Sequence, residues 1–356
     1  MLIVRSPVRI SFAGGGTDMP AYYEKYSGAV LSTSINKYFY SILRTRTDGK
    51  IQVISSDLRV TENWPNIERL PLRDSELQIP LAVIKEIARS VSVDLFLASE
   101  IVAGTGLGSS ASACVGVLKT LVTYLDLPFS KYQLAERAFH IGRNVLGKPI
   151  GKQDEYAAAF GGLNYITFNR DGSTLVEPIA LSGSLLRELQ SGLMLFFTGA
   201  AHDSWRLLKE QEHCVQRENG PAMESLHAIR GLAESMREVL LNGDFESFGR
   251  ILHTGWEAKK KISPLVSNSV IDRAYELAIE QGALGGKITG AGGGGFLLVF
   301  CKEESQEKVR RALAEVGIRE MAFEFDLDGA QVVVNDPFVD GDEKCGMRWV
   351  FSPIAA

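Results

Sequence analysis

The stretch Gly104-Thr-Gly-Leu-Gly-Ser-Ser-Ala-Ser112 lies between a strand-like segment, residues 93–98, and a run of small residues that predicts a helix over residues 110–125. The amide groups of a helix N-terminus and the positive end of the helix dipole favour a bound phosphate. Two familiar phosphate loops do not fit, because no lysine follows Gly108 as in Walker A, and the glycines run GxGxG, not GxGxxG. We therefore expect a phosphate-binding loop of another kind, with a plain helix cap as the alternative.

Two further glycine-rich segments lie on either side of this loop in the sequence. The first is Ser6-Pro-Val-Arg-Ile-Ser-Phe-Ala-Gly-Gly-Gly-Thr-Asp18, in which a strand-like run enters three glycines; a tight turn is the alternative to a ligand-facing loop. The other, which we call the third glycine segment because the loop 104–112 precedes it, has seven glycines within residues 285–295, directly before the apolar run 296–300. Because so much glycine costs chain entropy on folding, this density favours a backbone that approaches a ligand closely.

An acidic residue marks a fourth segment, Gly151-Lys-Gln-Asp-Glu-Tyr156, at a predicted junction between a loop and a helix. A carboxylate at such a junction either caps the helix or acts as a general base. The residues alone favour the cap for Asp154.

Composition excludes several classes of protein. The 356 residues carry 38 basic and 43 acidic side chains, a net charge of −5, so the chain lacks the global basic charge of a nucleic-acid-binding protein. Its four cysteines form no CxxC pair, which argues against a zinc site or a disulfide framework and suits a reducing, cytoplasmic location. Residues 101–118 are uncharged but rich in glycine and serine, so we expect neither a membrane span nor a membrane partner.

The pattern along the chain predicts an α+β protein. Residues 1–60 are β-rich, and Asp48-Gly49 between the runs 38–46 and 51–54 predicts a hairpin. Helical periodicity dominates from about residue 200 to 281, followed by strands at 296–300 and 332–334.

We expect two lobes, an N-terminal one over residues 1–190 and a C-terminal one over residues 191–356. The phosphate loop and the third glycine segment come from opposite halves of the chain. If both serve one ligand, the site lies in the cleft between the lobes.

Taken together, the four segments resemble the GHMP small-molecule kinases, and most closely the sugar branch of that family. The resemblance implies the two-lobed GHMP kinase fold, with a β-rich N-terminal lobe of the ribosomal protein S5 domain 2-like type and an α/β C-terminal lobe. It implies a phosphotransferase that uses ATP and Mg²⁺ and acts, as a monomer or homodimer, on the anomeric hydroxyl of a sugar phosphate. D-glycero-D-manno-heptose 7-phosphate is the first candidate substrate. An anomeric kinase for an unphosphorylated sugar such as fucose, and a non-catalytic sugar sensor, are the alternatives.

The resemblance also implies roles for single residues. Asp154 would take the proton of the acceptor hydroxyl, and Arg9 beside it would neutralise charge on the transferring phosphoryl group. Ser110 would bind Mg²⁺. The ATP phosphates would lie against Gly104, Thr105, Gly106, Leu107, Gly108, Ser109 and Ser110. The sugar would contact residues of the first and third glycine segments: Gly14, Gly15, Gly16, Thr17, Asp18, Gly290, Ala291 and Gly292.

At three positions the sequence departs from these relatives. Gly15-Gly16 replaces the Glu-His pair of galactokinases, which argues against galactose. Gly142 lies where several members carry a Mg²⁺-binding glutamate, which leaves Glu136 or a water as the second ligand, and His202 lies where related sugar kinases often have arginine. A phosphate on the substrate would need basic residues outside the phosphate loop; the candidates are Lys37, Arg44 and residues 259–261.

Overall fold

The larger of two β-sheets forms the N-terminal part of the molecule in this computed structural model, which describes residues 1–72, 75–199, 204–216 and 220–336. Its strands follow the order β12-β1-β2-β5-β3-β4, and β6 and β7 continue from the other part of the long β2. Their bounds are β1 (Leu2–Ala13), β2 (Gly28–Thr45), β3 (Ile51–Ser55), β4 (Val60–Trp64), β5 (Val93–Ser99), β6 (Leu163–Phe168), β7 (Thr174–Pro178) and β12 (Gln331–Asn335).

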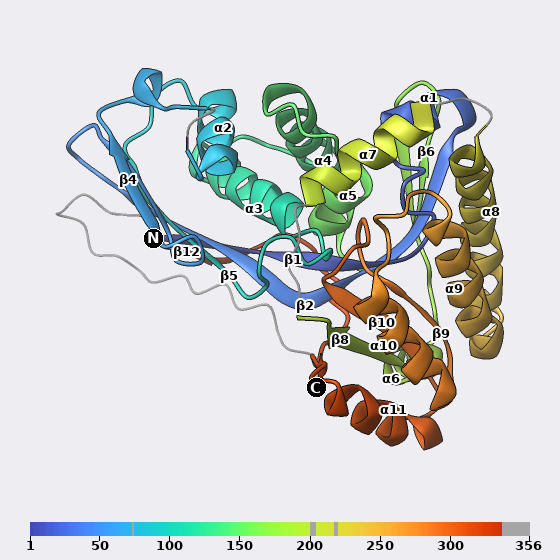
Figure 1. The fold of residues 1–356 in the computed structure, drawn as a ribbon. Coiled ribbons are helices and arrows are strands. Elements are labelled where there is room, and N and C mark those ends of the chain that lie inside the picture. The colour runs from blue at the N-terminus through green and yellow to red at the C-terminus, as the bar shows by residue number, and fades with distance from the viewer. Residues whose placement is uncertain (73–74, 200–203, 217–219, 337–356) are drawn as a thin grey trace.

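Four helices cover one face of this sheet (Figure 1). They are α2 (Gln78–Ile87), α3 (Ser109–Tyr124), α4 (Lys131–His140) and α5 (Gln153–Phe160). Ser130 and Gln133 form a capping box that starts α4, and a π-helical turn, Ile141–Val145, ends it. The apolar side of α3 is buried against β1 and β2, and this packing fixes the position of α3 and of its N-terminus relative to the sheet.

The second sheet has the order β11-β8-β10-β9 and lies on the other side of β1 and β2 (Figure 1). Its strands are β8 (Leu193–Phe197), β9 (Ala283–Ile288), β10 (Phe296–Cys301) and β11 (Arg319–Glu320). The remaining helices are α1 (Pro20–Tyr26), α6 (Gly183–Gly192), α7 (Ser204–Gln216), α8 (Pro221–Leu241), α9 (Phe245–Lys260), α10 (Ser269–Glu280) and α11 (Glu303–Glu315), and one 3₁₀ turn covers Ile67–Arg69.

The strand β1 joins the two parts. Its first residues alternate between buried and half-buried, but residues 6–13 are buried throughout. Val8, Ile10 and Phe12 belong to a core that also contains side chains of α8, α9 and β10. The end of β1 therefore delivers the first glycine segment to the junction between the N-terminal and C-terminal parts.

The α+β prediction is confirmed, but the predicted hairpin of β2 and β3 is wrong. The strand β5 lies between them, antiparallel to β2 and parallel to β3, with Val53 opposite Leu95. The turn at Asp48-Gly49 reverses the chain but leaves a gap one strand wide, and β5 fills it with Val93, Leu95 and Leu97 facing the core. The boundary near residue 190 stays a prediction; β12, from the second half of the chain, lies beside β1. Among the described helices, none has both the length and the apolar character to span a bilayer.

Candidate active site

The loop Gly104–Ser110 runs into the N-terminus of α3. Gly104, Gly106 and Gly108 have φ values of +79°, +82° and +78°, the left-handed region that favours glycine. No side chain caps α3, and its first turn holds no acidic residue. The first amide groups of α3 are therefore left for a ligand, as a phosphate-binding helix end requires.

The third glycine segment packs directly on this loop. A Cβ atom on Gly106 would lie 2.4 Å from the carbonyl oxygen of Thr289, and one on Gly290 would lie 2.5 Å from the Cα of Gly106. The Thr289 hydroxyl donates to the carbonyl oxygen of Thr105 over 3.3 Å. The prediction that these two segments lie close together in space is thus confirmed, and the contact explains why both backbones need glycine there.

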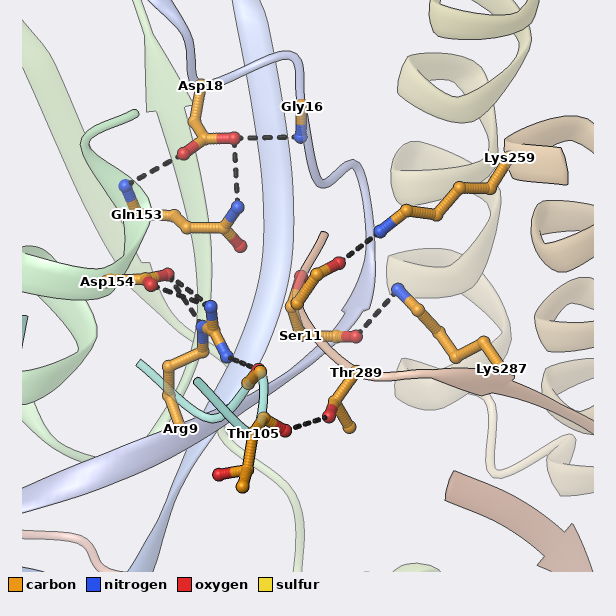
Figure 2. A network of polar contacts seen from close by, with 12 residues as sticks. Arg9, Ser11, Gly16, Asp18, Thr105, Gln153, Asp154, Lys259, Lys287 and Thr289 are labelled. Carbon is orange, nitrogen blue, oxygen red and sulfur yellow. Dashed lines mark hydrogen bonds and ion pairs between the residues drawn. The ribbon is translucent and has the colours of Figure 1, made fainter. Parts of the chain in front are cut away.

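Arg9 and Asp154 form a bidentate ion pair beside the loop (Figure 2). The Arg9 Nε donates to Asp154 Oδ1 and the second terminal nitrogen donates to Oδ2, each over 2.7 Å. Arg9 also donates to the carbonyl oxygen of Gly106 over 2.6 Å. The Arg9 side chain is 5% exposed and that of Asp154 27%; both residues line the cavity, and the carboxylate is the more accessible of the two.

Asp154 lies in the first turn of α5 and does not cap it, because no side chain caps this helix. The helix-cap interpretation, which the residues alone favoured, is therefore wrong. A Cβ on Gly108 would lie 3.1 Å from Asp154 Oδ2, which places the carboxylate against the phosphate loop.

A single cavity is lined by residues of all four sequence segments. Of the residues expected at the phosphates, it is lined by Gly104, Gly106, Gly108, Ser109 and Ser110, whereas Thr105 and Leu107 are buried and support the loop. Of those expected at the sugar, it is lined by Gly15, Gly16, Asp18, Gly290 and Ala291.

The other three residues expected at the sugar, Gly14, Thr17 and Gly292, do not line the cavity and instead stabilise the loops around it. The Thr17 hydroxyl donates to the carbonyl oxygens of Gly14 and Ala29, and a Cβ on Gly14 would lie 1.9 Å from the latter. Gly292, at φ +103°, packs against Val266.

Two buried lysines line the wall of the cavity opposite Asp154 (Figure 2). Lys259 donates to the carbonyl oxygen of Gly290, and Lys287 donates to those of Ser11 and Phe12 over 2.9 and 3.3 Å. Burial, with the nearby charge of Arg9, lowers the pKa of Lys259 to about 8, and burial holds the pKa of Lys287 well below its usual range. No ion pair to either is present in the described part of the chain.

The other basic candidates lie elsewhere. Lys37, Arg44, Lys260 and Lys261 do not line the cavity, and Lys260 pairs with Glu257. His202 lies outside the described residues.

Glu155 is an acidic residue that the sequence analysis missed. It is 3% exposed, lines the same cavity as Ser110, and its Oε2 atom has no hydrogen-bond partner. Burial, with the charge of Asp154 adding to it, raises the pKa of Glu155 well above the usual range. A Cβ on Gly142 would lie 2.5 Å from Ile150 Cδ1 and 4.0 Å from Glu155 Oε1, so Ile150 fills the space next to this position and Glu155 lies beyond it.

Glu136 does not share the cavity with Ser110. Its Oε1 accepts from Lys152 Nζ over 2.7 Å and from the Tyr156 hydroxyl over 2.5 Å. No cluster of three or more metal-binding side chains occurs within residues 1–72, 75–199, 204–216 and 220–336. An ion at Ser110 and Glu155 would therefore need further oxygen ligands from a bound phosphate or water.

Comparison with known proteins agrees with this geometry. A model described as the GHMP kinases N terminal domain matches residues 78–162, and one described as GHMP kinases C terminal matches residues 236–319. The D-glycero-alpha-D-manno-heptose 7-phosphate kinase of Campylobacter jejuni is 34% identical over 332 residues, 92% of this chain and 97% of that protein.

More distant relatives extend the comparison. A crystal structure described as a D-glycero-D-manno-heptose 1-phosphate kinase from Bacteroides thetaiotaomicron is 30% identical, with a TM-score of 0.80 over 95% of this chain and 100% of that one. A bifunctional fucokinase/GDP-fucose pyrophosphorylase of Arabidopsis thaliana is 26% identical over 88% of this chain and 31% of that protein. This chain belongs to the GHMP kinase family and is a homologue of its sugar kinases.

Proposed function

We propose that the protein transfers the γ-phosphoryl group of ATP to the anomeric hydroxyl of D-glycero-D-manno-heptose 7-phosphate, giving the 1,7-bisphosphate. The observation that carries the proposal is the Arg9–Asp154 pair, which lies against the phosphate loop in a cavity that the third glycine segment closes. A carboxylate, a cation and a phosphate-binding helix end in one cavity are the parts that phosphoryl transfer requires.

The proposed step uses Asp154 and Arg9 in distinct roles. The Asp154 carboxylate accepts the proton of the acceptor hydroxyl as its oxygen forms a bond to the γ-phosphorus. The bond from the γ-phosphorus to the bridging oxygen breaks, and its electron pair leaves with ADP. Arg9 holds both oxygens of Asp154 in position, and its charge stabilises the oxygens of the transferring group.

For Mg²⁺, we infer that Ser110 and Glu155 are the protein ligands. Ser110 and Glu155 line one cavity, the Oε2 atom of Glu155 is buried without a hydrogen-bond partner, and hard oxygen donors suit this ion. When bound with ATP, the ion would neutralise charge on the phosphates. Glu155 thus supplies the carboxylate that Gly142 cannot.

The assignment of a sugar 7-phosphate is supported by the relative from C. jejuni and by the two buried lysines. A substrate phosphate needs a cation that does not belong to Gly104–Ser110, and Lys259 is the candidate, bound to the Gly290 carbonyl oxygen where the third glycine segment packs on Gly106. Binding this remote phosphate would supply energy that orients the anomeric oxygen.

Two alternatives keep specific support. The fucokinase relative favours an unphosphorylated sugar, and the B. thetaiotaomicron structure is described as a kinase of a heptose 1-phosphate. A non-catalytic sensor is disfavoured, because Arg9, Asp154 and Ser110 are all in place in the cavity.

A coupled ADP-release assay tests the proposal against these alternatives. Heptose 7-phosphate, heptose 1-phosphate, free heptose and fucose are compared, and the product is identified by phosphorus NMR. We expect the highest kcat/KM with heptose 7-phosphate and a new phosphate on its anomeric carbon. Equal kcat/KM for heptose 7-phosphate and free heptose would mean that the distal phosphate is not recognised and would move the assignment to an unphosphorylated sugar.

A further inference from the structure

We propose that Lys148 binds a phosphate of the nucleotide beyond the α-phosphate, and that it supplies from another segment the cation that the phosphate loop lacks. The inference deepens the proposed function and rests on it for ATP as the phosphoryl donor. No lysine follows Gly108, so the loop Gly104–Ser110 offers a phosphate only backbone amides and hydroxyl groups. The phosphates of ATP carry several negative charges, and a charged donor binds such oxygens more strongly than a neutral one.

Lys148 lies in the loop that joins the π-helical turn Ile141–Val145 to α5, and its backbone is held there independently of its side chain. The Lys148 amide donates to the carbonyl oxygen of Gly142, and the Lys148 carbonyl oxygen accepts from the amide of Ile150, each over 2.9 Å. Pro149 between them restricts the backbone further. The conformation of the loop therefore leaves the Lys148 side chain available for a ligand.

The Lys148 side chain lies near the first two turns of α3. Its ammonium group is close enough to Cys114 and Glu155 for an electrostatic interaction with each. Cys114 follows Ser110 by four residues, which places both on one side of α3, and both line the cavity together with Lys148 and Glu155. A phosphate bound at the N-terminus of α3 would therefore lie close to the Lys148 ammonium group.

This ammonium group has no partner among the residues that the structure describes. No hydrogen bond or ion pair to Nζ occurs there, and Nζ is not one of the fully buried atoms that lack a partner. The residue is half-buried and lines the cavity, so a ligand can reach it. Burial lowers the pKa of Lys148, and Cys114 and Glu155 oppose this shift only in part. A cation that is partly removed from water without a partner is unfavourable, and a bound anion would supply that partner.

The position of Lys148 favours the nucleotide over the sugar phosphate as this anion. Three lysines of the described chain line the cavity: Lys148, Lys259 and Lys287. Lys259 and Lys287 donate to the third glycine segment and to the end of β1, whereas Lys148 lies near the face of α3 that carries Ser110. Lys148 is thus the lysine placed for the phosphates that the helix end binds.

Calorimetric titration of the full-length protein with a non-hydrolysable ATP analogue and with AMP tests the proposal, because AMP lacks the further phosphates. Lys148→Met keeps the length of the side chain and removes its charge. Lys85→Met is the matched control, since Lys85 is a half-buried lysine of α2 that does not line the cavity. We expect Lys148→Met to weaken binding of the ATP analogue by about 10- to 100-fold relative to Lys85→Met, and binding of AMP by less than about twofold. Lys148→Arg, which keeps the charge, should recover part of the lost affinity.

Titration in the presence of EDTA separates a direct contact from an effect through the metal site, because Glu155 lies near Lys148. A direct contact predicts that Lys148→Met weakens binding of the ATP analogue both with and without Mg²⁺. A loss confined to the experiment with Mg²⁺ would show that Lys148 acts through the metal site and would overturn the proposal. Equal losses for the ATP analogue and AMP, or an affinity within about twofold of Lys85→Met, would also overturn it.

Failure of this inference differs from failure of the proposed function. The titrations need no acceptor, so a protein that does not phosphorylate heptose 7-phosphate loses the proposed acceptor while the result for Lys148 stands. A parent enzyme that is active, with a Lys148→Met variant that binds the ATP analogue as the control does, loses only this inference. Thermal melting confirms that each variant is folded, and a Lys148→Met variant that fails to fold is replaced by Lys148→Gln.

Discussion

Replacing Gly106 with alanine should separate the phosphate loop from the third glycine segment. Gly106 has φ +82°, and an added Cβ would lie 2.4 Å from the carbonyl oxygen and 2.8 Å from the carbonyl carbon of Thr289. Real Cβ contacts are not shorter than 3.0 Å, so one of the two backbones must move by several tenths of an ångström. Because Gly106 also accepts from Arg9, this shift would displace the Arg9–Asp154 pair.

Gly49→Ala is the matched control for this substitution. Gly49 has φ +78° and no atom within 4 Å of the added Cβ, so the control carries the same backbone strain of about 1–2 kcal/mol without the steric clash. Calorimetric titration with a non-hydrolysable ATP analogue and steady-state kinetics measure the difference. We expect Gly106→Ala to weaken nucleotide binding and turnover by roughly 10- to 100-fold relative to Gly49→Ala, because a 1 Å displacement can cost about 100-fold and the shift needed here is somewhat smaller. Equal affinity and turnover in the two variants would refute the argument that this close contact builds the site.

Glu155→Gln should weaken the binding of Mn²⁺ to the enzyme–nucleotide complex by about 10-fold or more, as measured by electron paramagnetic resonance. The control, Glu136→Gln, should leave this affinity unchanged. Equal Mn²⁺ affinities in the two variants would remove Glu155 from the metal site. The pKa of Lys259 is lowered to about 8, so its ammonium group loses its charge as the pH rises through that value. The kcat/KM for a phosphorylated sugar should therefore fall above about pH 8. The kcat/KM for the free sugar should not show this break in its pH profile. The break should vanish in Lys259→Met, and its persistence there would assign it to another group.

The glycine segments could be interpreted from sequence because their function is local. Three glycines before a helix permit the left-handed backbone that this loop adopts, and that conformation leaves the first amides of α3 without a side-chain cap. The likeness of four ordered segments to one family then indicated the fold, and the structure brings Arg9 and Asp154 together as that likeness implied.

The remaining features depend on contacts between distant segments. The position of β5 between β2 and β3 is set by strand pairing across some fifty residues, and a turn signal at Asp48-Gly49 carries no information about it. The Asp18 carboxylate accepts hydrogen bonds from the backbone amides of Gly16 and Gln153, and only the folded chain places these donors around it. No sequence pattern marks Lys287, within the third glycine segment, as a cavity residue. Its hydrogen bond to the carbonyl oxygen of Ser11 in β1 identifies it as part of the cavity wall.

Turnover of Asp154→Asn with heptose 7-phosphate tests the central claim most directly. The amide keeps the shape of the side chain but cannot accept the proton as a carboxylate does, and it cannot accept both hydrogen bonds from Arg9. We predict that kcat falls by about 10²–10⁴-fold while the affinity for ATP stays within a few-fold. A turnover near that of the parent enzyme, in a variant that still binds ATP, would contradict the assignment of Asp154 as the base and of this cavity as the place of phosphoryl transfer.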